Sequence, residues 1–119
     1  MIQVRQSMFE TNSSSTHTLV IMNKNDFRQW SYSDDDDPEN IIYIENHKDG
    51  LKLHTGKEVI EKLNENDYWS KRWAEDNYET YIMHRFAYYN LGWYSYSICD
   101  TREEDIDDDR IAVSIYISD

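Results

Sequence analysis

The feature that most constrains the fold is an alternating segment near the C-terminal end of the chain. Between residues 110 and 117 every second residue is a branched aliphatic: Ile111, Val113, Ile115 and Ile117. Side chains of a β-strand point alternately to its two faces, so this period predicts a strand with one face in the core. The segment 93–99 also alternates, and the acidic segment 100–109 lies between the two. We therefore predict an antiparallel pair, 93–99 with 110–117, joined by a charged connector.

The first third of the chain predicts two further strands and a short helix. Met1–Ser7 alternates around Ile2 and Val4, and Thr18–Met22 is a more apolar strand. The polar segment 10–16 between them favours a turn, because its short side chains hydrogen-bond to nearby backbone. Residues 23–30 predict a short helix that begins at Asn23 or Asn25 as its N-cap.

The middle of the chain changes from a strand pattern to a helical one. The ranges 41–45 and 51–54 predict short strands around a turn at Asp49-Gly50. Thr55 and Glu58 have the spacing of a capping box, which predicts a helix over about 56–66, followed by a longer helix over about 67–90. The expected architecture is a single α+β domain over residues 1–119, with an antiparallel sheet packed against these helices.

Composition limits the class of protein. The chain has 119 residues, the usual size of one domain, and its ten Tyr and four Trp argue against intrinsic disorder. There is no apolar run long enough to span a membrane and no secretory signal pattern at the N-terminus. Because Cys99 is the single cysteine, no internal disulfide can form. We expect a cytoplasmic protein that does not bind a membrane.

The negative charge of the chain is concentrated in two segments. The formal net charge is −12, and the segment 34–39 contributes −5 while 100–109 contributes −6, so the two together account for −11. The acids of the first segment are Asp34, Asp35, Asp36, Asp37 and Glu39. Those of the second, opposed only by Arg102, are Asp100, Glu103, Glu104, Asp105, Asp107, Asp108 and Asp109.

Two interpretations of this acidity remain open. Both segments could be solvated loops, or they could form an acidic face that occupies a basic nucleic-acid-binding site on a partner protein. Such a face attracts cationic proteins and repels nucleic acid, so direct nucleic-acid binding is not expected. Seven acids over ten extended residues give about one charge per 5 Å, against about one per 1.7 Å of duplex DNA. One segment alone is therefore too sparse to imitate a duplex, and the two would have to come together.

No pattern of catalytic or metal-binding residues stands out. His17, His47, His54 and His84 lack metal-ligand spacing, and one cysteine excludes the usual zinc sets. Asp105, Asp107 and Asp109 alternate as in a calcium loop, but the required glycine and glutamate are missing. Three adjacent serines before His17 are better explained by a turn than by a nucleophile. We predict no catalytic residue, no cofactor and no metal.

One string resembles the opening of a known group. Residues 5–17, from Arg5 through Phe9-Glu10-Thr11-Asn12 to His17, are similar to the pattern R-x-S-x-F-E-T-N-S-S-S-T-H of small uncharacterised proteins from phages and Gram-positive bacteria. Extended through Leu19 the match covers 15 of the 119 residues, and the group has no function that could be transferred. The resemblance implies phage or mobile-element origin. It also gives weight to Asn12, Ser13, Ser14, Ser15 and His17 as a possible ligand-binding row.

Size, charge and implied origin together suggest two functions. The first is a non-enzymatic phage-type inhibitor, acting in anti-defence (as anti-CRISPR proteins do) or host takeover. Its partner would be a basic host protein such as a nucleic-acid-binding nuclease complex, contacted through the acidic residues named above. The alternative is a module that binds or sequesters a small ligand such as a nucleotide, built around residues 12–17.

Overall fold

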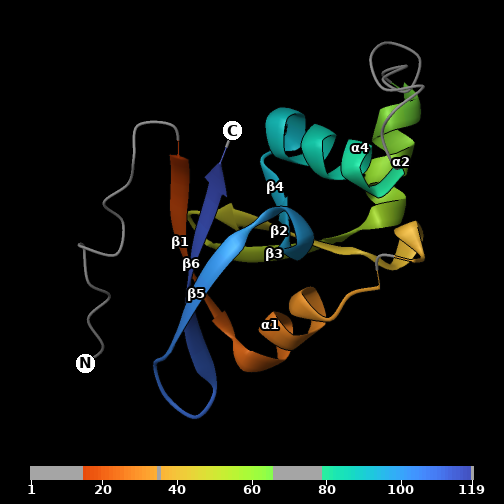
Figure 1. Cartoon of the computed structure of the whole chain (residues 1–119). Coiled ribbons are helices and arrows are strands. Elements are labelled where there is room, and N and C mark those ends of the chain that lie inside the picture. The colour runs from red at the N-terminus through yellow and green to blue at the C-terminus, as the bar shows by residue number, and fades with distance from the viewer. Residues whose placement is uncertain (1–14, 35, 66–78, 119) are drawn as a thin grey trace. The chain divides into compact units, whose positions relative to one another are not determined.

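The computed structural model describes residues 15–34, 36–65 and 79–118 (Figure 1). Contacts between Cα atoms divide the chain into two compact units. The first unit comprises residues 1–29 and 99–119, and the second comprises residues 30–98. Each unit contains one three-stranded antiparallel sheet, and each is described in turn.

The sheet of the first unit has β6 (Arg110–Ser118) at its centre, between β1 (Ser15–Asn23) and β5 (Asp100–Asp105). Both neighbours run antiparallel to β6, as Figure 1 shows. The strand predicted over 110–117 is confirmed, and the branched aliphatic residues of β6 are buried together with two residues from β1. This core consists of Val20, Met22, Ile111, Val113, Ile115 and Ile117. Ala112 and Ser114 on the other face of β6 are buried as well, so the expectation of a single buried face is wrong.

The strand partner that the sequence suggested for β6 is wrong. Segment 93–99 forms only the short strand β4 (Trp93–Ser95), which pairs with β2, and then a 3-10 turn over Tyr96–Ile98. The acidic segment, which we expected to be a connector, is itself β5 and pairs with β6 from Asp100 to Asp105. An edge strand has only one strand neighbour, so charged side chains remain hydrated there and the extended conformation tolerates them.

Helix α1 (Lys24–Ser31) follows β1 directly and confirms the cap predicted at Asn23. The Asn23 Oδ1 atom accepts a hydrogen bond of 2.7 Å from the backbone N–H of Asp26. The Asn23 amide nitrogen donates in turn to the Asp26 carboxylate at 2.9 Å. Asn23 thus satisfies an N–H group that the first turn of a helix leaves without an intrahelical partner.

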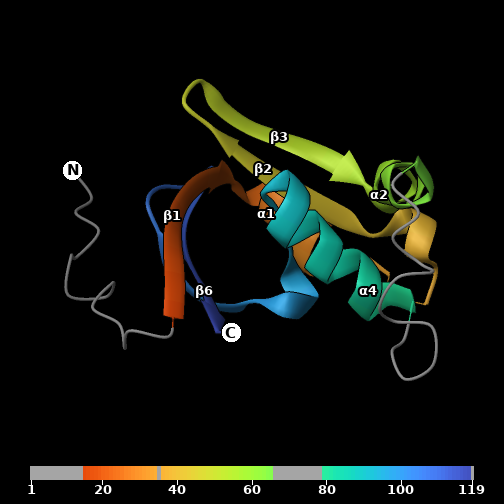
Figure 2. The same cartoon turned by 90° about the horizontal axis from the view of Figure 1, so that it is seen from above.

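The second unit contains a sheet in which β2 (Ile42–His47) lies between β3 (Gly50–Thr55) and β4. The β2–β3 hairpin predicted around Asp49-Gly50 is present, and Gly50 adopts a φ of 132° that favours glycine. Ahead of β2, Asp37 caps the short 3-10 helix Pro38–Asn40, labelled η2. Figure 2 shows α2 (Gly56–Glu65) continuing directly from the end of β3.

Two helical segments supply most of the core of the second unit. The predicted helix 56–66 is α2, and the C-terminal part of the predicted helix 67–90 is α4 (Glu79–Phe86) with a π-helical extension, Ala87–Leu91. Residues 67–78 lie outside the described part of the chain, as does the predicted strand Met1–Ser7. The buried cluster consists of Ile41, Tyr43, Val59, Leu63, Ile82, Met83, Phe86, Ala87 and Trp93. Helices and antiparallel sheets together confirm the α+β class.

Candidate functional site

Residues 100–109, which we call the acidic hairpin, form β5 and the loop that leads into β6. The register between the two strands places Asp105 opposite Ile111, and the Ile106 N–H donates to the Arg110 carbonyl at 3.1 Å. Of the seven acids in the hairpin, only Glu104 is half-buried and the other six are exposed. The hairpin therefore presents six carboxylates to solvent, three from the paired strand β5 and three from the loop that follows it.

The strand geometry divides these acids between two faces. Asp100, Arg102 and Glu104 point to one face of β5, whereas Glu103 and Asp105 point to the other. Successive residues on one face are about 6.6 Å apart, twice the rise per residue of a strand. One DNA strand carries a phosphate for about every 3.4 Å of helix axis, so neither face of β5 has the charge density of nucleic acid.

One acid of the loop is committed to holding the turn. The Asp107 Oδ1 atom accepts hydrogen bonds from the backbone N–H groups of Asp109 at 2.9 Å and Arg110 at 2.8 Å. Its Oδ2 atom accepts from the Arg110 guanidinium at 3.0 Å and 2.8 Å. The bonds from the Arg110 side chain and from the Asp109 backbone hold the pKa of the Asp107 carboxyl below its usual value of 3.8. Asp107 thus builds the loop and is partly neutralised by Arg110.

A second acid is also opposed within the first unit. Lys24 approaches the Asp105 carboxylate at 3.5 Å, with both side chains in contact with solvent. Counting Lys24, Arg102 and Arg110 against the seven acids, the neighbourhood of the hairpin carries −4. Among the described residues, no basic group lies within 4 Å of Glu103, Asp108 or Asp109. Together with Asp100, which is exposed and also has no such base, they are the carboxylates available to an external cation.

Glu104 differs from the other acids of the hairpin. Its Oε2 atom is shielded from solvent and has no hydrogen-bond partner, and the same is true of the Ser114 hydroxyl on β6. Ala112 lies opposite Glu104 and Ser114 opposite Arg102, so Glu104 and Ser114 share a face of the sheet. A shielded carboxylate oxygen without a donor is destabilising. Glu104 thus differs from the six exposed acids, because one of its oxygens lies against the sheet beside the Ser114 face.

The first acidic segment, 34–39, belongs to the second unit and is largely occupied by local capping. The Asp34 carboxylate accepts from the Asp36 N–H at 2.8 Å. The Asp37 carboxylate accepts from the Glu39 N–H at 3.3 Å and from the Asn40 amide at 2.8 Å. Asp36 and Glu39 are exposed, and Asp35 lies outside the described residues. Asp34 and Asp37 thus have a structural role that the charge pattern alone did not reveal.

The predicted ligand-binding row is only partly described. Asn12, Ser13 and Ser14 lie outside the described residues, whereas Ser15 and His17 belong to β1. The expectation of a turn through Ser15 and Thr16 is wrong, because both pair with β6. The His17 ring lies against Tyr116, with 5.9 Å between ring centroids.

Sequence reasoning missed a network of two histidines and two glutamates in the second unit. The two oxygens of Glu45 contact different rings, His54 Nε2 at 2.7 Å and His47 Nε2 at 2.9 Å. His54 Nδ1 lies 3.3 Å from Glu58, and the His54 ring stacks on Trp93 with centroids 3.6 Å apart and an interplanar angle of 3°. We call these five residues the His–Glu network.

The network explains why both glutamates stay ionised. Partial burial raises the pKa of Glu45, but the hydrogen bonds from His54 and His47 outweigh it and leave that pKa below its ordinary value of 4.5. The Thr55 backbone N–H holds the pKa of Glu58 down, and His54 lowers it further. Because its two ring nitrogens face carboxylates from different elements, His54 links β2, β3 and α2.

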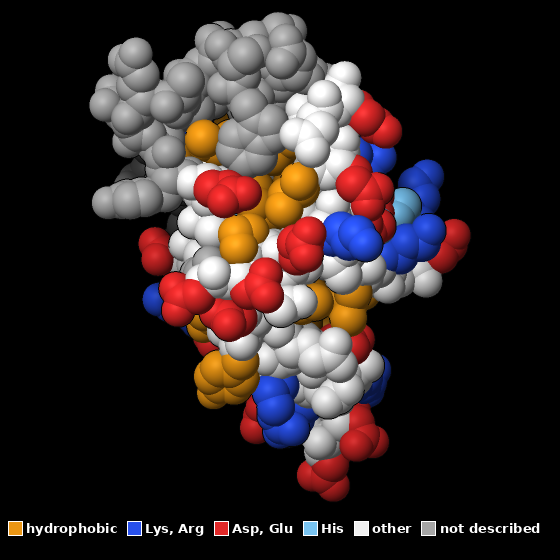
Figure 3. Space-filling view, turned by 90° about the vertical axis from the view of Figure 1, so that its right-hand side faces the viewer, with side chains coloured by type: hydrophobic (Ala, Val, Ile, Leu, Met, Phe, Trp, Pro, Cys, Tyr) orange, Lys and Arg blue, Asp and Glu red, His pale blue; other side chains and the backbone are white. Residues whose placement is uncertain are grey.

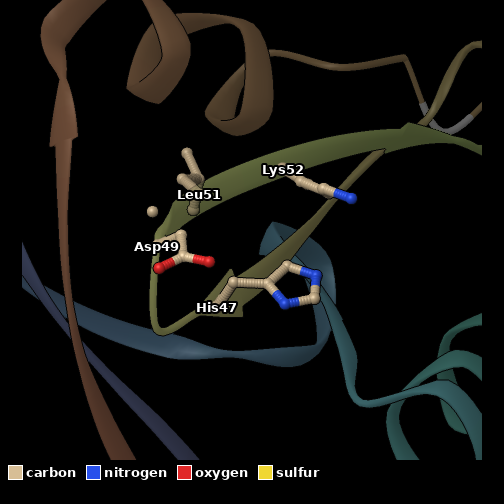
Figure 4. A pocket seen from close by; sticks show the side chains of 5 residues that line it. His47, Asp49, Leu51 and Lys52 are labelled. Carbon is tan, nitrogen blue, oxygen red and sulfur yellow. The ribbon is translucent and has the colours of Figure 1, made fainter.

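A hollow of about 340 Å³ lies at the turn of the β2–β3 hairpin (Figure 4). It is lined by His47, Asp49, Gly50, Leu51 and Lys52. One acidic side chain, Asp49, and one basic side chain, Lys52, therefore border the same hollow. Within residues 15–34, 36–65 and 79–118, no three His, Cys, Asp or Glu side chains gather in a way that could hold a metal ion. The hollow is lined by residues of one exposed turn.

Charge on the surface is not uniform. On the face shown in Figure 3, Asp and Glu side chains are scattered among Lys, Arg and uncharged side chains.

The described helices include none that is long and apolar enough to cross a membrane. Comparison with known proteins gives no match to a family model, a curated protein or a solved structure. Any functional conclusion must therefore come from the residues themselves.

Proposed function

We propose that the chain is a non-enzymatic binding protein whose acidic hairpin docks on a basic site of a partner protein and so blocks nucleic acid from that site. The observation that carries the proposal is the group of carboxylates at Glu103, Asp108 and Asp109, which has no base within 4 Å among the described residues. A native structure that leaves charges uncompensated on a rigid element gives a cationic partner something to neutralise.

The spacing of the acids on β5 favours a protein partner whose basic residues alternate along an extended segment. Glu103 and Asp105 lie about 6.6 Å apart along one face of β5, a spacing that alternate residues of an extended basic segment would match. The inhibitor role rests on the same chemistry, because Lys and Arg side chains that bind phosphates are the natural partners of such acids. The likeness of residues 5–17 to phage proteins makes a host protein the expected target.

The test begins with affinity capture from a bacterial extract at low salt. We expect a basic nucleic-acid-binding protein that elutes by about 0.5 M salt, where the Debye length falls below about 5 Å. Binding should then be measured for the combined variant Glu103→Gln, Asp108→Asn, Asp109→Asn. Losing three interfacial charges is expected to weaken binding about tenfold or more, mainly through the association rate. Asp107 is spared because its carboxylate builds the loop.

A matched control removes three exposed acids from the second unit: Asp49→Asn, Glu61→Gln and Glu65→Gln. It has the same net charge as the hairpin variant and should bind almost normally. If both variants weaken binding equally, overall charge is responsible rather than the hairpin. Salt-independent binding, or full affinity of the hairpin variant, would refute the proposal. The ligand-binding alternative gains no support from the described residues.

A further inference from the structure

The two edges of the first unit's sheet differ sharply in charge. At one edge, β5 carries four acids and Arg102 among six residues. At the other edge, the nine residues of β1 (Ser-Thr-His-Thr-Leu-Val-Ile-Met-Asn) include no Asp, Glu, Lys or Arg. Charged side chains are a common protection of edge strands against pairing with other chains. That protection is present on β5 and missing on β1.

The backbone of β1 has hydrogen-bonding groups directed away from β6. The Lys24 N–H donates to the Asp109 carbonyl at 2.8 Å, in the same register as the β1–β6 pairs. In an antiparallel ladder, hydrogen-bonded and non-bonded pairs alternate, so Met22 and Val20 bond to β6 whereas Leu19 and Ile21 do not. The N–H and C=O groups of Leu19 and Ile21 thus face the open edge, where the sheet has no further strand among the described residues.

The side chains at this edge are apolar. Ile21 is 51% exposed and is one of few large hydrophobic side chains on the described surface, while Leu19 on the same face is half-buried. Val20 and Met22 point to the opposite face and are buried in the core. A strand added beside β1 would satisfy the backbone groups of Leu19 and Ile21 and shield the Ile21 side chain.

We infer that β1 is an interaction edge, and that its partner is β1 of a second copy of this chain, paired antiparallel across a twofold axis. Such pairing places Leu and Ile against Leu and Ile, as the self-complementary patch of a twofold dimer requires. It brings no like charges together, although each chain carries −12. By contrast, two copies of β5 could not pair, because Asp100, Glu103, Glu104 and Asp105 would face one another.

The charge distribution supports a second copy of the chain as the partner of β1. The resulting sheet would run β5-β6-β1-β1-β6-β5, with the two acidic strands at its outer edges. Five strand spacings separate them by about 24 Å, well beyond a Debye length of about 8 Å at physiological salt. The antiparallel arrangement also sends the two acidic loops toward opposite ends of the sheet. The dimer thus avoids repulsion between the acidic hairpins and leaves both of them accessible.

The test is the mass in solution, measured by light scattering from about 1 to 100 µM, a range that reveals a micromolar dimer. We expect the full chain to dimerise and Ile21→Lys to be monomeric, since a lysine is a typical protection of an edge strand. Ile21→Thr is the matched control, because it keeps a β-branched side chain without charge and should retain most of the dimer.

Amide hydrogen exchange keeps the test decisive if a variant is poorly folded. In the dimer, the Leu19 and Ile21 amides should be protected at high protein concentration and exchange faster on dilution, while the Val20 amide stays protected throughout. A chain that remains monomeric at about 100 µM would overturn the inference. So would a dimer that Ile21→Lys leaves intact, or protection of Leu19 and Ile21 that does not depend on concentration.

Discussion

The two charged hairpins of this protein use their charges in opposite ways. In the β2–β3 hairpin, Glu45 receives both His47 and His54, so its carboxylate is satisfied within the fold. In the acidic hairpin, Asp107 is bound by Arg110, but Glu103, Asp108 and Asp109 have no base within 4 Å among the described residues. The first arrangement stabilises the protein, whereas the second leaves net charge for a partner. Counting acids alone would treat the two as equivalent.

The largest expected effect on stability comes from Gly56, which lies where β3 ends and α2 begins. Gly56, at the start of α2, donates its N–H to the Ile41 carbonyl at 2.7 Å, and an added Cβ would clash with the Pro38 carbonyl oxygen. Because that obstacle is backbone, Gly56→Ala should destabilise the protein by about 3 kcal/mol, the upper end of the usual cost of overpacking. Urea unfolding followed by circular dichroism measures the change.

The control for this prediction is Lys57→Ala, one position further along α2 at an exposed site. It should change the free energy of unfolding by less than about 0.5 kcal/mol. A Gly56→Ala protein as stable as the parent would show that the segment before β2 yields easily. The hairpin would then be less firmly anchored than the close approach of Gly56 indicates.

The second effect separates the two contributions of His54 to the His–Glu network. His54→Phe keeps an aromatic ring on Trp93 but removes both contacts to carboxylates, so we expect a loss of about 1–3 kcal/mol. His54→Ala should lose a further 0.5–1.5 kcal/mol, roughly the value of an aromatic pair. Equal stability of His54→Phe and the parent protein would mean that the carboxylate contacts contribute nothing.

The two contacts of Glu58, with Thr55 and with His54, show which interactions the sequence alone could predict. The capping box was predictable because Thr55 and Glu58 are three residues apart, and both reciprocal bonds are present, at 2.8 Å and 3.4 Å. That Glu58 also reaches His54 was not predictable, because the contact depends on the register between β2 and β3. Local spacing determines local bonds, but cross-strand neighbours follow only from the pairing.

The acidic hairpin illustrates the same limit. Alternation along 110–117 correctly predicted the strand and the burial of its branched aliphatic side chains, but not that Ala112 and Ser114 between them are also buried. A period of two also does not identify the strand beside it. Segment 93–99 alternated well and yet ends as a strand at Ser95. The real neighbour, 100–105, is hidden from a hydrophobicity pattern because its strand is almost entirely charged. The position of the acidic side chains could be read from the sequence, but the strand that carries four of them could not.

A third prediction concerns how the stability provided by Glu45 and Glu58 depends on pH. The pKa values of Glu45 and Glu58 lie below their ordinary value of 4.5, so below that pH the unfolded chain binds more protons than the folded one. Their stabilising effect is therefore complete above about pH 4.5 and is lost as the pH falls through the folded-state pKa values. Glu45→Gln should flatten the fall in melting temperature between pH 5 and about pH 3. An unchanged pH profile would remove Glu45 from the network.

The smallest effects distinguish the acids within the hairpin. Asp107→Asn should lower the melting temperature, because Asn has one acceptor oxygen in place of the two that receive Asp109, Arg110 and the guanidinium. Asp108→Asn removes a carboxylate without a hydrogen bond among the described residues, so its melting temperature should stay the same or rise slightly. Any rise should disappear at about 0.5 M salt, because screening removes the repulsion that the substitution relieves. If Asp108→Asn were the more damaging of the two, its charge would have a structural role and would not be left for a partner.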